Sequence, residues 1–321
     1  MAKKKIGVLT SGGDAPGMNA AVRAVTRSAI SKGFEVVGIR RGYNGLLHGD
    51  MIPLDVQAVS DIIQRGGTMI YTARCPEFKE WENVVKAKDI CIEQGMAGIV
   101  VIGGDGSFRG AADLSKAGIP CVGLPGTIDN DIQCSEYTIG YDTAMNTVVD
   151  MIDKLRDTSH SHERCAVVEV MGRNAGHIAV NTGLACGATA VLVPEVEYDI
   201  DKVIARIREV RAAGKMQFIV VVAEGIGGTD EIAKRIQAET GIESRATVLG
   251  HVQRGGAPTV RDRVVASEMG YYAVELLEKG IGNRVVGLKD GKVYDVDIQE
   301  ALSMKKPFNE RLYRICNEIN F

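Results

Sequence analysis

Several features that would assign this chain to a class of protein at once are missing from its 321 residues. It has no run of about eighteen apolar residues, so no membrane-spanning helix is expected. The formal net charge of -3 gives no overall attraction to nucleic acid or to an anionic membrane, and neither is expected as a partner. The seven cysteines are scattered and contain no C-x-x-C pair, which indicates reduced thiols rather than disulfides or a metal site.

A secretory signal is not expected either. Lys3–Lys5 resemble the basic start of one, but the apolar run after them, Ile6–Leu9, is far too short. Together with the thiol pattern, this predicts a soluble, cytoplasmic protein. With 45% hydrophobic residues, the chain is long enough to bury a sizeable core and to form two lobes.

Short apolar runs alternate with longer amphipathic stretches along the chain. Because this alternation favours parallel strands covered by helices on both faces, the sequence predicts a doubly wound α/β fold. Ligands bind such sheets beyond the carboxyl ends of the strands. The expected strands are 6–10, 35–40, 98–102, 119–124, 166–170, 190–193, 218–223 and 247–249, and the expected helices include 18–32, 77–94, 201–213, 229–240 and 262–279.

Two of the expected strands end in glycine-rich loops that carry an aspartate, TSGGDAPGMN at 10–19 and GGDGS at 103–107. Glycine lets backbone N–H groups point at an anion, and the helix that follows adds its positive end. Neither loop is a P-loop, since no Gly-Lys-Ser/Thr follows, and neither has clean G-x-G-x-x-G spacing. The loops favour a nucleotide phosphate site of another design over two simple strand–helix turns.

A third loop, PGTIDNDI at 125–132, follows another expected strand and holds Thr127, Asp129 and Asp131. A plain turn needs only one Asp or Asn. Since neighbouring strands end at one edge of a sheet, we expect these carboxylates to share a cleft with Asp105. Phosphoryl transfer needs Mg²⁺ on the phosphates and a group that accepts the proton of the acceptor hydroxyl, and aspartates suit both tasks.

The second half of the chain carries cations near the ends of expected strands. Arg173 lies in MGRNAG, Arg164 stands just before a strand, and His251 and Arg254 lie in GHVQRGG, preceded by Arg245. Guanidinium groups pair with phosphate through two hydrogen bonds. Any single arginine could be a surface residue, but the set favours a phosphorylated small molecule as the substrate.

These motifs, in this order, resemble those of bacterial ATP-dependent 6-phosphofructokinases from the first strand to about Pro307. The resemblance is carried by TSGGDAPGMN, GGDGS, PGTIDNDI, VVEVMGR, ATVLGHVQRGG and KKPF. PGTIDND with MGR downstream is highly specific, whereas other kinase families share GGDG. The resemblance implies two Rossmann-like, doubly wound lobes, with ATP bound by 1–140 and 254–307 and fructose 6-phosphate by 141–253 and 308–321.

Roles follow from the resemblance by position. Asp129 would deprotonate the 1-hydroxyl of fructose 6-phosphate, while Thr127 would help to hold that hydroxyl and the γ-phosphate. Arg173 would stabilise the transferring phosphoryl group, Asp131 would support the same charge network, and Asp105 would bind Mg²⁺. The products would be fructose 1,6-bisphosphate and ADP, in the committed step of glycolysis.

The binding residues implied by the resemblance form two sets. Those for ATP are Gly13, Arg74, Cys75, Gly104, Asp105, Gly106 and Ser107. Those for fructose 6-phosphate are Thr127, Ile128, Asp129, Arg164, Met171, Gly172, Arg173, Glu224, Arg245, His251, Val252, Gln253 and Arg254. Arg164 and Arg245 would reach the substrate of a neighbouring subunit, which implies a homotetramer.

Three other functions remain open at this point. A pyrophosphate-dependent enzyme would tend to have Asp and Lys where Gly106 and Gly126 stand, and these glycines leave room for a nucleotide. A lipid or NAD kinase would share GGDG but lack PGTIDND and the MGR loop. A catalytically silent nucleotide-binding regulator would have lost an aspartate, and none is missing.

The resemblance also implies a second phosphate site between subunits, for ADP as activator or phosphoenolpyruvate as inhibitor. Its basic positions here are Arg23, Arg27, Arg156 and Lys215. However, Val56 stands where an arginine is usual, and Thr189 where a glutamate meets the Mg²⁺ of the effector. We therefore expect an anion to bind, but ADP activation and phosphoenolpyruvate inhibition to be weak or altered in sign.

Overall fold

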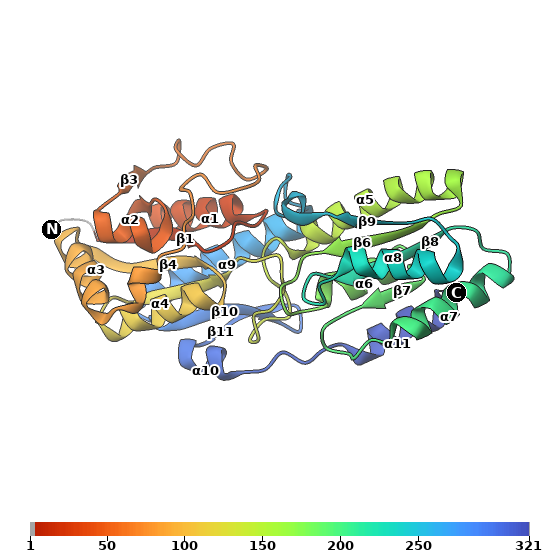
Figure 1. Ribbon diagram of the computed structural model, residues 1–321. Helices are drawn as coiled ribbons and strands as arrows, with labels where there is room; N and C mark the ends of the chain where they lie inside the picture. The colour runs from red at the N-terminus through yellow and green to blue at the C-terminus, as the bar shows by residue number, and fades with distance from the viewer. Residues whose placement is uncertain (1–3, 321) are drawn as a thin grey trace. The chain divides into compact units, whose positions relative to one another are not determined.

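The computed structural model describes residues 4–320 and divides them into two compact units (Figure 1). The first unit comprises the chain up to Ile128, Ile132–Thr143 and Arg254–Lys306. The second comprises Asp129–Asp131, Ala144–Gln253 and the residues from Pro307 on. Both units are therefore assembled from stretches that are far apart in the sequence.

The first unit contains a mostly parallel sheet. Its strands are β1 (Lys5–Ser11), β2 (Glu35–Ile39), β3 (Met51–Leu54), β4 (Met96–Gly103), β5 (Cys121–Pro125), β10 (Arg284–Lys289) and β11 (Lys292–Asp297). They lie in the order β11-β10-β5-β4-β1-β2-β3, and only the pairs β2–β3 and β10–β11 are antiparallel. The central strand β4 is an almost continuous buried apolar run, as expected of a strand covered on both faces.

Helices cover both faces of this sheet. They are α1 (Met18–Ser31), α2 (Gly42–His48), α3 (Trp81–Glu93), α4 (Asp105–Lys116), α9 (Val260–Glu278) and α10 (Ile298–Ser303). On one face, Tyr43 of α2, Val84 of α3 and Phe108 of α4 share a buried cluster with Leu9 and Val101 of the sheet. On the other face α1 packs against α9, and the small Gly270 of α9 permits this close approach.

The second unit contains a parallel sheet in the order β7-β8-β6-β9. Its strands are β6 (Cys165–Val170), β7 (Ala190–Leu192), β8 (Phe218–Ala223) and β9 (Ser244–Val248). Its helices are α5 (Tyr141–His162, which starts in the first unit), α6 (His177–Ala185), α7 (Ile200–Ala212), α8 (Thr229–Thr240) and α11 (Glu310–Ile319). Buried residues of α7 and α8, including Ile204 and Ile236, form one core with Val167 and Val220 of the sheet.

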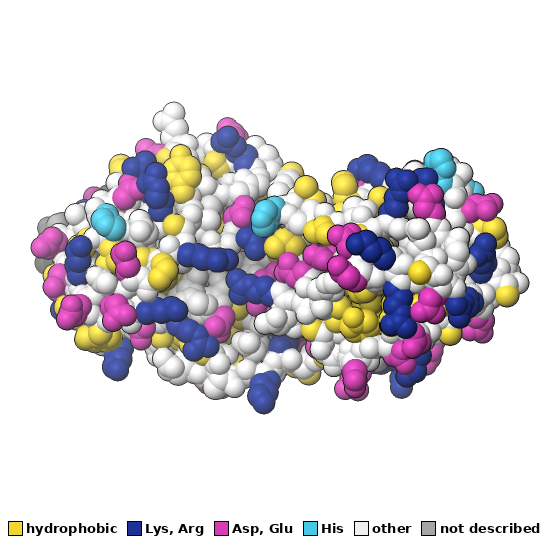
Figure 2. Space-filling model, viewed as in Figure 1, with side chains coloured by type: hydrophobic (Ala, Val, Ile, Leu, Met, Phe, Trp, Pro, Cys, Tyr) yellow, Lys and Arg dark blue, Asp and Glu magenta, His cyan; other side chains and the backbone are white. Residues whose placement is uncertain are grey.

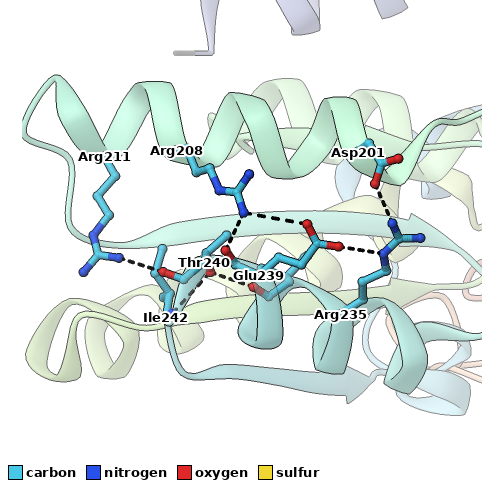
Figure 3. A network of polar contacts seen from close by, with 8 residues as sticks. Asp201, Arg208, Arg211, Arg235, Glu239, Thr240 and Ile242 are labelled. Carbon is cyan, nitrogen blue, oxygen red and sulfur yellow. Dashed lines mark hydrogen bonds and ion pairs between the residues drawn. The ribbon is translucent and has the colours of Figure 1, made fainter.

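A solvent-exposed polar network joins α7 to α8 (Figure 3). Arg235 of α8 contacts Asp201 of α7 at 2.5 Å and Glu239 of its own helix at 3.1 Å. Arg208 and Arg211 of α7 donate hydrogen bonds to the last carbonyl groups of α8. These carbonyls have no partner inside their own helix, so the two arginines satisfy them from outside.

Three expected elements differ from the structure. The helix expected over 77–94 begins only at Trp81, because Pro76–Lys79 form a 3-10 turn and Glu80 is extended. The strand expected at 247–249 is β9, which starts at Ser244. GGDGS is not a free loop, since β4 runs to Gly103 and Asp105 already begins α4.

The surface is mixed in charge. Figure 2 shows basic and acidic side chains interspersed over the visible face, as the small net charge leads one to expect. Within residues 4–320, no helix combines the length and apolar character needed to cross a lipid bilayer.

Candidate active site

The three loops predicted to bind phosphate and substrate all begin at the same end of the first sheet, where its parallel strands finish. This end is called the carboxyl edge below. Ser11 of β1 pairs with Gly103 of β4, and Gly103 pairs with Pro125 of β5. The residues that follow, beginning with Gly12, Gly104 and Gly126, therefore leave three neighbouring strands at the same edge. This edge is the carboxyl end of the parallel strands, where ligands of doubly wound sheets bind.

Hydrogen bonds hold these loops to one another. The Ser107 hydroxyl donates to the Ser11 carbonyl at 3.0 Å, and Gly126 N donates to the Gly103 carbonyl at 3.0 Å. The buried Tyr43 hydroxyl donates to the Ser107 carbonyl at 2.6 Å. Ser107, predicted to bind ATP, thus also ties the second glycine loop to the first.

Glycine occupies the positions at this carboxyl edge for different reasons. A Cβ at Gly104 or Gly106 would meet no atom of the protein within 4 Å, and neither residue has positive φ. By contrast, a Cβ at Gly126 would lie 2.9 Å from Ile102 Cγ2. Packing therefore explains Gly126, so the argument that a glycine leaves room for a nucleotide is supported at Gly106 and not at Gly126.

Arg254 lies against the first glycine loop. A Cβ at Gly13 would be 2.7 Å from Nη1 of Arg254, so the guanidinium covers this glycine closely. Arg254 Nε is buried and has no hydrogen-bond partner among the described residues. Arg254, which is predicted to bind the sugar phosphate, thus lies beside Gly13, which is predicted to bind the nucleotide.

The segment that carries Arg74 and Cys75 is anchored at the same edge. The Thr72 hydroxyl donates to the Gly12 carbonyl at 2.9 Å, and the Thr10 hydroxyl donates to the Tyr71 carbonyl at 2.8 Å. Arg74 is exposed and Cys75 is half-buried. Both predicted ATP-binding residues therefore follow a stretch that is bonded to the first glycine loop.

Asp105, the predicted Mg²⁺ ligand, is the first residue of α4. Its carboxylate is partly exposed, and Oδ2 lies 3.0 Å from Nε of Arg109, one helical turn along. Among the described residues, no three His, Cys, Asp or Glu side chains cluster as a metal site would require. A single carboxylate oxygen donor fits Mg²⁺, which commonly binds through one or two carboxylates, substrate phosphates and water.

Asp129 lies in the second unit with Asn130 and Asp131. The Asp129 side chain is buried, with 4% of its surface exposed, and Oδ2 lies 3.4 Å from Nε of Arg173. Asn130 and Arg173 both have positive φ, 50° and 54°, so the backbone turns sharply beside the carboxylate and beside its cation. The ion pair joins the predicted base to the residue predicted to stabilise the phosphoryl group, whereas a cleft shared with Asp105 stays a prediction.

Glu224 positions the MGR loop. Val170, which ends β6, pairs with Ala223, which ends β8, so the residues after both strands are neighbours. Glu224 Oε1 accepts hydrogen bonds from Gly172 N at 3.2 Å and from Arg173 N at 2.6 Å. Besides its predicted contact with the sugar, Glu224 therefore holds the backbone that presents Arg173.

The GHVQRGG segment forms a 3-10 turn, Gly250–Arg254, in which the side chains divide into two kinds. Gln253 is fully buried, where Oε1 accepts from Met171 N at 3.1 Å and Nε2 donates to the Gly250 carbonyl at 3.0 Å. His251 and Val252 are exposed. Gln253 therefore holds the backbone of Met171. If it contributes to substrate binding, as predicted, we expect it to do so through Met171.

Arg164 and Arg245 lie at the amino ends of the strands of the second sheet, opposite the carboxyl ends that Arg173 and Glu224 follow. Arg164 precedes β6 and Arg245 is the second residue of β9, so Arg245 is not in a strand-end loop as expected. Glu243, which the sequence reasoning missed, lies 2.7 Å from each guanidinium. The hydrogen bond from Arg164, and then that from Arg245, lowers the pKa of the Glu243 carboxyl.

The residues predicted for an effector fall in both units. Arg23 and Arg27 are half-buried on α1, while Arg156 of α5 donates a hydrogen bond to the Cys186 carbonyl. Burial lowers the pKa of Lys215, and the positive charges of Arg156 and Arg206 lower it further. Arg206 of α7 is a third cation in this unit that the sequence did not indicate.

Comparisons with known proteins identify the family of this chain. The sequence profile of the family described as phosphofructokinase matches residues 5–277. An ATP-dependent 6-phosphofructokinase of Clostridium botulinum is 58% identical over 313 residues, which cover 98% of each chain. The ATP-dependent 6-phosphofructokinase 1 of Clostridium perfringens is 57% identical over 317 residues, covering 99% of each. The chain belongs to the phosphofructokinase family.

Solved structures show the same fold. The phosphofructokinase of Saccharomyces cerevisiae superimposes with a TM-score of 0.91 at 31% identity, over 98% of this chain and 50% of the yeast chain. A pyrophosphate-dependent phosphofructokinase from Marinobacter aquaeolei gives a TM-score of 0.87 at 20% identity, over 96% of this chain and 86% of the other. At that identity the second match supports the fold alone, and the predicted α/β architecture is confirmed.

Proposed function

We propose that this chain is an ATP-dependent 6-phosphofructokinase, which moves the γ-phosphoryl of MgATP to the 1-hydroxyl of fructose 6-phosphate. The observation that carries the proposal is the buried Asp129 carboxylate, ion-paired with Arg173 in a chain that matches ATP-dependent relatives over nearly its whole length. The products are fructose 1,6-bisphosphate and ADP. A glycolytic kinase works in the cytoplasm with these metabolites, and we propose that location for this chain.

Asp129 is the proposed base. Its carboxylate accepts the proton of the 1-hydroxyl as that oxygen attacks the γ-phosphorus. The neighbouring guanidinium of Arg173 pairs with this carboxylate and is proposed to face the charge on the transferring phosphoryl group. Thr127, on the same loop, is proposed to hold the hydroxyl and the γ-phosphate, and Asp131 supports the charge network.

The nucleotide is proposed to bind at the carboxyl edge of the first sheet. The open space over Gly104 and Gly106 supports this, because the protein itself does not require glycine there. Gly13, Arg74, Cys75 and Ser107 complete the proposed site, and the Asp105 carboxylate is proposed to bind Mg²⁺. When bound with the nucleotide, Mg²⁺ neutralises charge on the phosphates.

The sugar phosphate is proposed to lie between residues of two subunits. Within one chain, Arg173 and Glu224 follow the carboxyl ends of β6 and β8, whereas Arg164 and Arg245 lie at the amino ends of β6 and β9. The six residues of β6 span about 20 Å, more than one sugar phosphate can bridge. Arg164 and Arg245 are therefore proposed to serve a neighbouring subunit in a homotetramer, while Met171, Gly172, His251 and Arg254 serve their own.

A donor comparison tests this function. Purified protein is assayed for fructose 1,6-bisphosphate formation with fructose 6-phosphate and either MgATP or magnesium pyrophosphate. We expect rapid turnover with ATP and almost none with pyrophosphate, since Gly106 leaves space that a pyrophosphate donor does not need. Comparable rates with both donors would mean that the pyrophosphate-dependent alternative is correct.

Regulation is proposed to be weak or altered in sign. Arg156, Lys215 and Arg206 supply positive charge in the second unit, but Thr189 is buried there and offers no carboxylate for a metal. Val56, in the first unit, offers no cation. Saturation curves for fructose 6-phosphate with and without millimolar ADP or phosphoenolpyruvate test this, and strong inhibition by phosphoenolpyruvate relieved by ADP would contradict it.

A further inference from the structure

Asp262, in the first turn of α9, is fully buried in the first unit. Oδ1 accepts hydrogen bonds from the Tyr137 hydroxyl at 2.5 Å and from Gly140 N at 2.7 Å. Oδ2 accepts from Thr143 N at 2.9 Å and from the Thr143 hydroxyl at 2.5 Å. A buried carboxylate is costly unless its oxygens are satisfied, and here four donors from one short segment do so.

The bonded segment is 137–143, where the chain approaches the start of α5. Thr259, the N-cap of α9, reinforces the attachment: its hydroxyl accepts from Asp262 N at 3.3 Å, and its N–H donates to the Thr143 hydroxyl at 3.0 Å. Burial raises the pKa of Asp262, while the hydrogen bonds from Thr143 and Tyr137 oppose that rise. The start of α9 therefore holds segment 137–143 at both of its ends.

The same segment is hydrogen-bonded to the loop that carries Thr127. The Thr138 hydroxyl donates to the Thr127 carbonyl at 2.6 Å, and Ile139 N donates to the Pro125 carbonyl at 2.8 Å. Gly126 and Ile139 also form an isolated parallel bridge. The loop is thus held at Pro125 and at Thr127 by residues that lie within the stretch bonded to Asp262.

Segment 137–143 also packs against the first glycine loop. A Cβ at Gly140 would lie 2.7 Å from Ala15 Cβ, and a Cβ at Gly17 would lie 2.7 Å from Ile139 Cγ2. Both glycines have positive φ, 104° and 102°, so the backbone needs glycine at these contacts on two grounds. One stretch of chain therefore supports both the predicted phosphate loop and the Thr127 loop.

We propose that Asp262 is a positioning residue for phosphoryl transfer: through segment 137–143 it fixes the Thr127 loop and the first glycine loop for the reaction. The inference rests on the proposed function of these loops. Asp262 touches neither loop by hydrogen bond, so its effect is exerted through Tyr137, Gly140 and Thr143. Reacting groups must be held to within a fraction of an ångström, and a displacement of about 1 Å can cost about 10²-fold in rate.

Asp262→Asn tests the role by kinetics. The amide keeps the shape but replaces one acceptor oxygen by an NH₂ group. That donor must face either the N–H and hydroxyl of Thr143 or the Tyr137 hydroxyl and Gly140 N–H, so hydrogen bonds are lost in either orientation. We expect kcat to fall about 10- to 100-fold while the KM values for both substrates change far less. Tyr272→Phe, which removes a 2.7 Å hydrogen bond to Asp295 from the same helix, is the control and should leave kcat unchanged.

A double-mutant cycle separates positioning from a general loss of stability. Thr138→Val removes the bond to the Thr127 carbonyl without touching Asp262. If Asp262 acts through segment 137–143, the double variant should be little worse than the poorer single variant. Losses that multiply, or a kcat for folded Asp262→Asn equal to that of the wild type, would overturn the proposal. If Asp262→Asn does not fold, Thr143→Val takes its place in the cycle.

Amide hydrogen exchange gives a test that does not need activity. In Asp262→Asn, exchange of the Gly126 and Ile139 amides should accelerate about tenfold or more, whereas the amides of β8 in the second unit should be unchanged. Unchanged exchange at Gly126 and Ile139 would overturn the proposal. If the wild-type protein did not phosphorylate fructose 6-phosphate, the proposed function would be wrong. The exchange rates of Gly126 and Ile139 would still show whether Asp262 holds the two loops.

Discussion

The two units present different chemistry at the carboxyl edges of their sheets. In the first unit glycines form much of this end, with open space over Gly104 and Gly106, while Asp105 and Arg254 add charge there. In the second unit charged side chains follow the strands, and Glu224 orders the backbone of Arg173, which pairs with Asp129. We infer that shape and backbone donors matter more for the ligand proposed at the first end, and side-chain charge more for the ligand proposed at the second. Added bulk should therefore disturb the first, and lost charge the second.

The largest effect is expected from Asp129→Asn in the second unit. The amide retains the shape but cannot accept the proton, so kcat should fall by about 10²- to 10⁴-fold with little change in KM. Steady-state kinetics on protein of unchanged melting temperature measures this. Near-normal kcat in the folded variant would rule out Asp129 as the base.

Arg245→Ala should act on one substrate only. Loss of a charge-assisted phosphate contact costs about 1.5–3 kcal/mol, so the KM for fructose 6-phosphate should rise about 10- to 100-fold while that for ATP is spared. Glu243→Gln is the informative companion, because it leaves Arg245 charged but weakens its ion pair. Equal effects of Arg245→Ala on both KM values would argue against the assignment.

Gly106→Ala should separate stability from binding in the first unit. The added methyl group meets no protein atom and lies in the first turn of α4, so unfolding should become up to about 1 kcal/mol less favourable. The same methyl would crowd the nucleotide at a cost of about 1–3 kcal/mol, which predicts a KM for ATP raised about tenfold or more. An unchanged KM for ATP would show that the space over Gly106 is not used by the nucleotide.

The smallest effect is expected from Arg235→Ala in the polar network between α7 and α8 (Figure 3). Both of its ion pairs are exposed, and such pairs contribute little to stability because water and salt screen them. We expect a slight fall in melting temperature and no change in kcat or either KM. A large fall in melting temperature, or a change in kcat or in either KM, would contradict this expectation.

Much of the fold follows from local pattern. The strands at 6–10, 98–102 and 218–223 are short apolar runs, and the structure has a strand at each. The helix expected over 229–240 is α8, with the same bounds. Such elements are predictable because the alternation of polar and apolar residues within each run is enough to define them.

Other elements could not be read from local pattern. Neither the hairpin β10–β11 nor the long helix α5 was expected, and α5 begins in one unit and continues into the other. The helix start at Trp81 depends on a 3-10 turn that propensity does not indicate. Tertiary pairing decides such segments more than the residues within them.

The candidate site shows the same division. The motifs around Thr127, Asp129 and Arg173 identified the expected site residues, because residue types at strand ends are visible in the sequence. The partners that hold them were not visible. Asp262 lies more than a hundred residues from the segment it binds, and only the folded chain brings the two together.

The interleaving of the two units determines what a growing polypeptide can complete during its synthesis. The strands of the second sheet all lie between Cys165 and Val248, so the residues that pair in it emerge from the ribosome close together in time. β5, by contrast, must wait for β10 at Arg284–Lys289 to cover its open edge. We therefore expect a nascent chain halted once Val248 has emerged from the ribosome to carry a protease-resistant second sheet and a first sheet that is still unfinished, exposed and in need of a chaperone.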